Sequence, residues 1–272
     1  MSFSSLFLSL QQEGFLIRSS ICTGLTELRN ANLGEKGRYY TAFFQLAIAL
    51  ERFTKLALIL DHMVANDLAP PGGQAVRAYG HDINSLFMSA RAIAAAHGYP
   101  VASDSEIEPI QSTILGFLSE FAQTTRYANL DALASGAGGI NPLARWHDVV
   151  IEIVRLHVSQ KRLARIEQQA AEFAELTQGI ILVRAHDLSD RPLTEQTWLA
   201  QPQIYSLAAR YASWYCFKLF SFLKDLVRSL THDAIDLDLK RQGQVANIPE
   251  MSDFFDFLWA DRKIVLKKKR WP

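Results

Sequence analysis

The stretch GRYYTAFFQLAIALERFTKLALILDHMVANDLAPPGG, residues 37–73, constrains the fold more than any other part of this chain. Its apolar side chains recur every three or four residues, at Ala42, Leu46, Ala49, Leu50, Phe53, Ala57, Leu60 and Val64. This spacing places them on one wide face of a helix, and the Pro-Pro-Gly-Gly run then stops the helix. The sequence therefore predicts a single long helix over about residues 38–65, whose apolar face other helices must cover.

The same periodicity predicts most of the remaining elements. Further helices are expected over about residues 82–97, 105–126, 146–177 and 203–232, with a first helix at the N-terminus and a short one over 249–261. Asp82 is a good N-cap for the 82–97 helix, and Gly98 is a good terminator. Ser103 or Ser105 is expected to cap the next helix. Residues 179–188, GIILVRAHDL, form either a short strand or a helix end.

Glycines and Pro142 in SGAGGINPLARW make the strongest internal break and divide the chain into residues 1–135 and 136–272. We expect an all-α protein whose two regions pack into one unit. A chain of 272 residues that is 49% hydrophobic can bury a large core.

The 28 Lys and Arg residues equal the 28 Asp and Glu residues in number, so any nucleic acid must be bound by a local patch. No apolar run approaches the roughly 18 residues of a membrane span, so no membrane partner is expected. The N-terminal stretch has neither the basic region nor the cleavage site of a signal peptide. Cys22 and Cys216 match no metal or redox spacing, which indicates buried free thiols and a cytoplasmic location.

Histidine is followed by aspartate four times, at His81–Asp82, His147–Asp148, His186–Asp187 and His232–Asp233. Helical phosphohydrolases of the HD type use such a doublet to hold a divalent metal that activates water. None of the four doublets lies after an apolar helix and before a glycine, where that family usually has it, and aspartate at a helix start is common because it caps free N–H groups. We expect no metal site and no cofactor, and keep the phosphohydrolase as a distant alternative.

Arginine lies close to histidine in three places, as Arg77 with His81, Arg91 with His97, and Arg228 with His232. Such a pair could cleave RNA without metal, because the histidine would move a proton and the arginine would neutralise charge on phosphorus. Arg228 and His232 are four residues apart and share a helix face, which is the best geometry. Arg91 and His97 fall on different faces unless their helix ends between them. A structural role at helix ends is the alternative for each pair.

Basic side chains also gather locally. Arg155, Lys161, Arg162 and Arg165 could form a stripe on the predicted 146–177 helix, although a solvated helix face would look the same. The C-terminal KIVLKKKRWP contains Lys267, Lys268, Lys269, Arg270 and Trp271. This tail could bind RNA phosphates and stack its tryptophan on a base, or it could be only a polar chain end.

The order of YYTAFFQLAIALERFTKLALIL, a Pro/Gly turn and YGHDINSLF resembles the HEPN superfamily of helical domains over about residues 35–95. In that family a helix of the form Ala-x-x-x-Glu-x-x-x-Lys is followed by a loop and by His-Asp-Leu at the start of the next helix. The first pattern is matched by Ala47, Glu51 and Lys55, and the second by His81, Asp82 and Ile83.

The resemblance implies a HEPN-like helical bundle, here with an additional helical C-terminal half. Members of the family often dimerise, serve prokaryotic toxin–antitoxin or antiphage defence systems, and in many cases are metal-independent endoribonucleases. Their nuclease signature is an arginine and, after a short spacer, a histidine late in the bundle. Arg228 and His232 resemble it with a shorter spacer and with Ser229 in place of asparagine, whereas Arg91 and His97 have the spacing but lie in the His-Asp-Leu helix.

Two functional hypotheses follow. The first is an RNA-directed effector in which Arg228 stabilises the phosphate and His232 is the general acid and base, with a homodimer as its form. The second is a non-catalytic helical adaptor that regulates a protein partner, such as an antitoxin or a component of a defence system.

Overall fold

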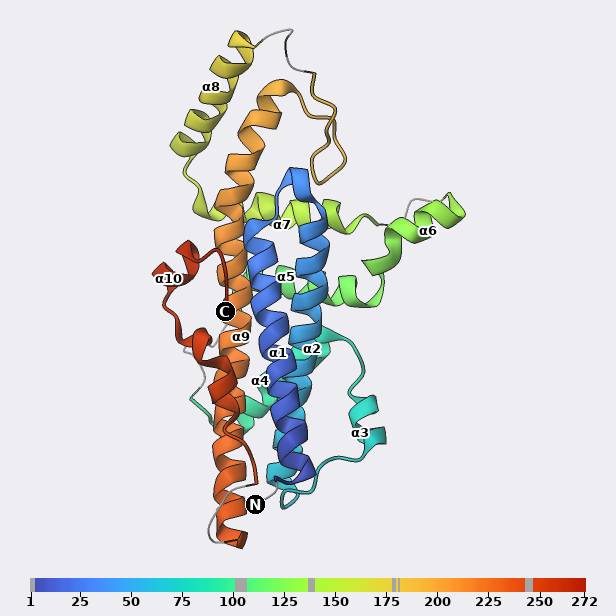
Figure 1. Ribbon diagram of the computed structural model, residues 1–272, viewed down its shortest axis with the longest axis vertical. Coiled ribbons are helices and arrows are strands. Elements are labelled where there is room, and N and C mark those ends of the chain that lie inside the picture. Colours follow the sequence, from blue (N-terminus) through green and yellow to red (C-terminus); the bar gives the residue numbers. More distant parts are fainter. Residues whose placement is uncertain (1–2, 101–106, 137–139, 178–179, 181, 243–246) are drawn as a thin grey trace.

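The computed structural model describes residues 3–100, 107–136, 140–177, 180, 182–242 and 247–272 (Figure 1). Across these residues every regular element is a helix, and the one β-type feature is an isolated antiparallel bridge between His186 and Pro192. The predicted all-α class is therefore confirmed, and the described part of 179–188 forms neither a strand nor a helix end. No helix in the described ranges combines the length and the apolar character needed to cross a membrane.

Three long helices lie side by side and form the body of the molecule: α1 (Ser5–Asn30), α2 (Gly37–Ala65) and α9 (Glu195–Gln242) (Figure 1). The predicted 38–65 helix is thus confirmed as α2. A short 3-10 turn, η1 (Leu33–Glu35), joins α1 to α2. The two helices approach closely at Gly24, where a Cβ atom would lie 2.8 Å from Leu46.

A second group of helices covers α2 and part of α9: α4 (Ile83–His97), α5 (Pro109–Gln123) and α7 (Pro142–His157). The start of α4 is fixed as predicted, because Asp82 Oδ1 accepts a hydrogen bond of 3.0 Å from the Asn84 backbone N–H. Its end is also as predicted, since Gly98 adopts a φ of +64° that suits glycine. Consequently α2 and α4 are neighbours in one bundle, connected through the short α3 (Gly73–Ala78).

The remaining elements lie at the periphery. Helix α8 (Gln160–Leu176) packs along α9, whereas η2 (Thr125–Tyr127) and α6 (Ala128–Ser135) extend away from the bundle (Figure 1). The C-terminal segments η3 (Met251–Trp259) and α10 (Arg262–Lys267) fold back onto α9. The short helix expected over 249–261 is therefore a 3-10 helix.

Helices from both sides of residue 136 share one hydrophobic core. Phe43 of α2 contacts Phe117 of α5 and Trp146 of α7, with ring centroids 4.7 and 5.1 Å away. Aromatic contacts of this kind stabilise a core beyond the area that they bury. Cys22 and Cys216 are buried free thiols, as predicted, and burial raises their pKa values to about 11 and about 12.

The prediction of one helix over 146–177 is wrong, because α7 ends at His157 and α8 begins at Gln160. Val158 and Ser159 are extended, and the Ser159 hydroxyl accepts from the Arg162 backbone N–H as an N-cap. The apolar periodicity continues through this corner, so spacing alone does not reveal it. The break lets α8 turn and pack along α9.

Two other predicted helices, over 105–126 and over 203–232, have different boundaries in the structure. Helix α5 begins at Pro109 rather than near 105, and the Gln111 side chain accepts from the Glu108 backbone N–H at 3.0 Å. Both predicted caps, Ser103 and Ser105, lie outside the described residues.

The helix predicted over 203–232 extends over Glu195–Gln242 and contains Pro202 about two turns from its start. A proline inside a helix removes one backbone hydrogen bond and places its ring against the carbonyl of the preceding turn, so periodicity that includes it favours a later start.

Candidate functional site

Glu51 on α2 contacts two other residues that carry the HEPN resemblance, Lys55 and His81. Its Oε1 accepts a hydrogen bond of 2.8 Å from Lys55 Nζ, one turn further along the helix. The same oxygen lies 2.9 Å from His81 Nδ1, in the turn before α4. The packing of α2 against α4 thus brings together side chains that are thirty residues apart in the sequence.

The contact with Glu51 orients the imidazole of His81. With Glu51 ionised, the Nδ1–H of the neutral ring points at the carboxylate, which leaves Nε2 as the acceptor. The His81 side chain is 78% exposed, so this nitrogen is accessible. A carboxylate that orients a histidine in this way is the arrangement that a general acid or base needs.

The Glu51–His81 pair borders a cavity of about 390 Å³, which we call the histidine cavity; its walls are Phe44, Ala47, Ile48, Glu51, His81, Phe121, Ala122, Gln123 and Arg126. Arg126 comes from η2, and its guanidinium lies 5.0 Å from the Tyr127 ring centroid. Within the described chain no carboxylate forms an ion pair with Arg126. The cavity therefore combines an oriented histidine with a cation that could neutralise a phosphate.

Asp82, the second member of this His-Asp doublet, has a structural role. Besides capping α4, its Oδ1 accepts a hydrogen bond of 2.8 Å from Ser119 of α5. Hydrogen bonds from Ser85 and Ser119 lower the pKa of Asp82.

Residues of the other doublets also have partners within the fold. His147 Nδ1 lies 2.9 Å from the Tyr205 hydroxyl, and Asp187 accepts from backbone N–H groups of its own turn. Asp233 accepts from the Tyr99 hydroxyl at 2.5 Å. In the part of the chain that the structure describes, no three His, Cys, Asp or Glu side chains are grouped as metal ligands.

Two of the three predicted arginine–histidine pairs are not brought together. Arg77 lies in α3, and among the described residues no hydrogen bond or ion pair joins it to His81. Arg91 lies 5.9 Å from the Phe222 ring centroid, whereas His97 Nε2 lies 2.8 Å from Asp61 Oδ1 on α2. These contacts with different helices fit the expectation that Arg91 and His97 lie on different faces.

Arg228 and His232 share a face of α9, as predicted, but both contact the C-terminal segment. The Arg228 guanidinium lies 5.4 Å from the Trp259 ring centroid. His232 Nε2 lies 3.3 Å from Glu250 Oε2, in the turn that begins η3. Both side chains therefore help to hold this segment on α9, and neither lines the histidine cavity.

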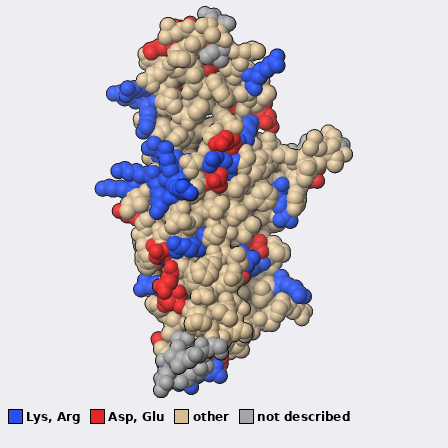
Figure 2. Space-filling view, viewed as in Figure 1, with Lys and Arg blue, Asp and Glu red and all other residues tan. Residues whose placement is uncertain are grey.

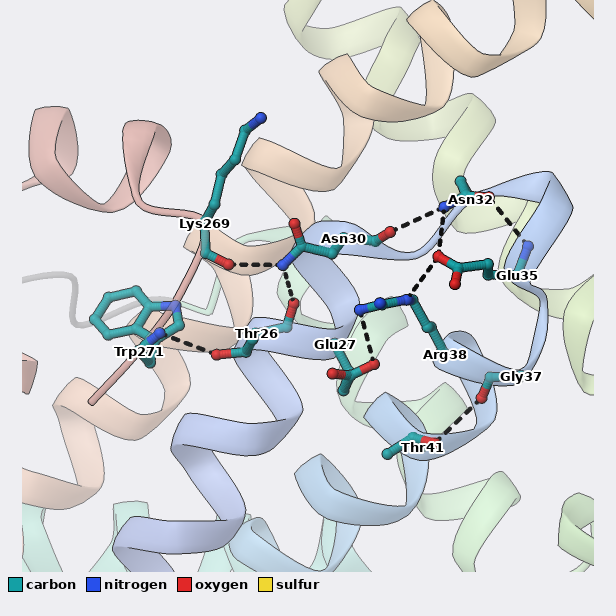
Figure 3. Close-up of polar contacts among 10 residues, drawn as sticks. All are labelled: Thr26, Glu27, Asn30, Asn32, Glu35, Gly37, Arg38, Thr41, Lys269 and Trp271. Atoms are coloured by element: carbon teal, nitrogen blue, oxygen red, sulfur yellow. Dashed lines mark hydrogen bonds and ion pairs between the residues drawn. The ribbon is translucent and has the colours of Figure 1, made fainter.

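The basic C-terminal tail, residues 267–272, is attached along α1 (Figure 3). The Asn30 side chain donates to the Lys269 carbonyl at 2.7 Å, and the Trp271 backbone N–H donates to Thr26 Oγ1 at 2.9 Å. Trp271 is only 5% exposed and contacts Phe217 and Phe257. The prediction that this ring stacks on a base does not fit its buried position. Lys267, Lys269 and Arg270 are exposed, and Lys268 is half-buried.

A second cavity, of about 810 Å³, lies between α8 and α9, and we call it the basic groove. Its walls are Ser159, Lys161, Arg162, Arg165, Ile166, Gln169, Pro202, Gln203, Ser206, Leu207 and Arg210, with no carboxylate among them. Figure 2 shows Lys and Arg gathered along this edge of the molecule, where Figure 1 places α8 and α10. Arg155 differs from these cations because Glu152 binds it at 2.6 Å.

Arg29 and Arg210 form a like-charged pair beside the basic groove. Arg29 is 5% exposed, and its pKa is lowered by burial and by the charge of Arg210. The Nε atoms of both are buried without a hydrogen-bond partner among the described residues. Two buried cationic donors without an acceptor are costly, and an anion bound in the groove would reduce the repulsion between the two arginines.

Sequence reasoning missed Arg126, Arg29 and Arg210. Each lies within an ordinary helical stretch, and their significance comes from long-range packing. The one available signal was the clustering of Lys161, Arg162 and Arg165, which did predict a basic stripe.

No family model, no curated protein and no solved structure matches this chain.

Proposed function

We propose that this protein binds RNA through the basic groove and the adjoining C-terminal tail. The observation that carries the proposal is the Arg29–Arg210 pair, two like charges with unpartnered donors beside a groove whose walls hold four cations and no carboxylate. This repulsion destabilises the folded protein, and the binding of an anion relieves it. Anion binding therefore stabilises the folded protein.

The groove and the tail are connected by the last turn of α1. Arg29 faces Arg210 of the groove, and Asn30 binds the Lys269 carbonyl of the tail. The last turn of α1 therefore lies between the two basic surfaces. Phosphate contacts of this kind supply most of the affinity of sequence-independent binding.

Fluorescence anisotropy with a labelled single-stranded RNA tests this proposal. Four phosphate contacts in the groove give an expected log–log slope of affinity against salt of about −3. We expect Arg165→Glu to weaken binding about tenfold, whereas the matched control Arg77→Glu, on α3, changes it less than about twofold. Equal effects of the two substitutions, or affinity that does not depend on salt, would contradict the proposal.

A second candidate function is metal-independent cleavage of RNA at the histidine cavity. The observation that favours it is the contact of Glu51 with His81 in a cavity that also holds Arg126. His81 Nε2 would take the proton of a ribose 2′-hydroxyl, whose oxygen would then bond to phosphorus and displace the 5′-oxygen. The leaving 5′-oxygen would take a proton from the protonated His81 or from water, and Arg126 would neutralise the charge that develops on phosphorus. The proposed chemistry is the one predicted from the sequence, but it is assigned to His81 and Arg126 instead of Arg228 and His232.

Incubation of the purified protein with total RNA in EDTA tests this second function. We expect His81→Gln and Arg126→Gln each to abolish cleavage, and His232→Ala to retain it. Loss of activity in His232→Ala alone would return the site to Arg228 and His232. Cleavage that requires added divalent metal would favour the HD-type alternative.

The biological role that we propose with these activities is an effector of a prokaryotic toxin–antitoxin or antiphage system, acting as a homodimer. It rests on the HEPN resemblance over residues 35–95. The neighbouring genes test the role, and light scattering tests the dimer. A protein partner that co-purifies from the native host, together with no RNA binding and no cleavage, would favour the non-catalytic adaptor.

A further inference from the structure

The basic groove contains other side chains besides its cations. Ile166 and Leu207, both buried, and Pro202 give it an apolar part. The exposed amides of Gln169 and Gln203 add hydrogen-bond donors and acceptors. Its volume of about 810 Å³ is within the range of pockets that hold small molecules. Apolar surface, amides and cations in one cavity match the base and the phosphate of a single nucleotide.

The cations of the groove are concentrated at the start of α8. Lys161 and Arg165 are four residues apart, which is about 6 Å along the helix axis, and Arg162 lies between them in the sequence. Arg210 is the fourth cation and comes from α9. An RNA backbone carries one charge on each phosphodiester, so cations that follow the backbone would be distributed along it. Cations gathered in one cavity favour a single phosphate group of higher charge.

The first turn of α8 also favours an anion. It contains no acidic residue, and Lys161 and Arg162 lie there instead, against the positive end of the helix dipole. The backbone N–H groups of Gln160 and Lys161 have no hydrogen-bond acceptor within the described ranges, since the Ser159 hydroxyl accepts from Arg162. A phosphate at this end of α8 would accept from these N–H groups and reduce the repulsion.

Arg210 provides a second, independent observation on the opposite wall. It lines the groove, and its Nε is buried without a hydrogen-bond partner among the residues that the structure describes. Arg29, which is only 5% exposed, has an Nε in the same condition, and the charge of Arg210 acts on it. Both α8 and α9 therefore direct uncompensated positive charge toward the groove.

We propose that the basic groove binds the terminal nucleotide of an RNA through a phosphate monoester at that end. This inference rests on the proposed RNA binding and specifies which RNA is bound. A phosphate monoester carries a charge of about −1.5 to −2 near neutral pH and three acceptor oxygens, whereas a phosphodiester carries one charge. The phosphate lies at the start of α8, and the base lies against Ile166, Pro202 and Leu207.

Fluorescence anisotropy with three RNAs of one sequence and one internal label tests the proposal. The first RNA has a 5′-phosphate, the second has a 3′-phosphate, and the third has hydroxyls at both ends. We expect at least one phosphorylated RNA to bind about tenfold more tightly than the hydroxyl RNA, and that RNA identifies the end. Equal, salt-dependent binding of all three would overturn this inference and leave the proposed RNA binding intact. No binding of any of them would contradict both.

Two substitutions of exposed cations show whether the groove is responsible. We define the preference as the ratio of the affinities for the phosphorylated and the hydroxyl RNA. Arg162→Gln, in the groove, should reduce a tenfold preference to about threefold or less. The matched control Lys269→Gln, in the C-terminal tail, should weaken all three RNAs alike and leave the preference unchanged. An equal loss of preference in both variants would overturn the assignment to the groove.

The pH dependence of this preference gives a further readout. Neither a histidine nor a carboxylate lines the groove, so no side chain of the lining titrates between pH 5.5 and 7.5. A phosphate monoester loses its second charge as the pH falls below about 6. The preference should therefore decrease from pH 7.5 to pH 5.5, and a preference that stays constant over this range would contradict the proposal.

Discussion

The Glu51 cluster (Glu51, Lys55 and His81) and the basic groove deal with their cations in opposite ways. Beside the histidine cavity, Lys55 and His81 share the carboxylate of Glu51. In the groove, no carboxylate lines the wall, and the charge of Arg210 acts on another arginine, the buried Arg29. Where the fold pairs its charges, they hold helices together, and where it leaves them unpaired, they are available to an external anion.

The largest effect that we expect in this comparison comes from Glu51→Ala. The Lys55 side chain is only 16% exposed, so loss of its partner leaves a half-buried ammonium group unpaired. The free energy of unfolding, measured by urea titration, should fall by about 2 kcal/mol. Glu152→Ala is the control, because it breaks an exposed pair and should leave the unfolding midpoint unchanged. Equal effects of the two substitutions would show that burial does not distinguish these pairs.

Arg210→Met should increase the stability of the folded protein, whereas Glu51→Ala decreases it. It removes one member of the repelling Arg29–Arg210 pair and one buried donor without an acceptor. We expect the free energy of unfolding in low salt to rise by about 1.5 kcal/mol. Arg162→Met, in the exposed part of the groove, should not change it. A loss of stability in Arg210→Met would mean that the guanidinium is satisfied within the fold, and the RNA proposal would lose its main support.

Asp82→Ala removes a hydrogen-bonded carboxylate next to His81. Near neutral pH it should lower the free energy of unfolding by about 1 kcal/mol, because α4 loses its N-cap. Because hydrogen bonds lower the pKa of Asp82 in the folded state, its contribution is present above the unfolded pKa. It is lost as the pH falls through the folded pKa. Denaturation at several acidic pH values should therefore show the wild type and the variant converging, and a constant difference would contradict this assignment.

The smallest effect is expected from Arg155→Gln. Glu152 already neutralises Arg155, so this arginine should contribute little to RNA affinity, although it belonged to the predicted basic stripe. The RNA affinity, measured by fluorescence anisotropy, should fall less than about twofold. Arg162→Gln should reduce this affinity clearly more. Similar losses in both would show that pairing within the fold does not decide which cations bind RNA.

Local signals were sufficient for some helices and insufficient for others. The boundaries of α2 and α4 were predictable because periodic apolar residues end at strong stop signals, the Pro/Gly run and Gly98. The corner at Ser159 was not predictable from spacing, since the apolar pattern continues across it. Ser159 is a residue type that favours a helix N-cap and so indicated a new helix, but the continuous apolar periodicity favoured a single helix.

The candidate sites were predictable only in part. His81 and Glu51 were singled out from the sequence, but their contact depends on how α2 and α4 pack. Arg126 enters the same cavity from η2, which no pattern connects with α2. Trp271 was assigned to a surface role because it ends a basic tail, whereas the fold places its ring against Phe217 and Phe257.

The sequence by itself determined that this protein is built from helices and which stripe of α2 is buried, because helical periodicity repeats every three or four residues and can be read locally. Only the tertiary structure decided which charges are paired. Glu51 reaches His81, and Arg29 meets Arg210, across helices whose separation in the chain carries no information about their distance in space. Electrostatic energies depend on that distance and on burial, so the features that suggest function are set by packing.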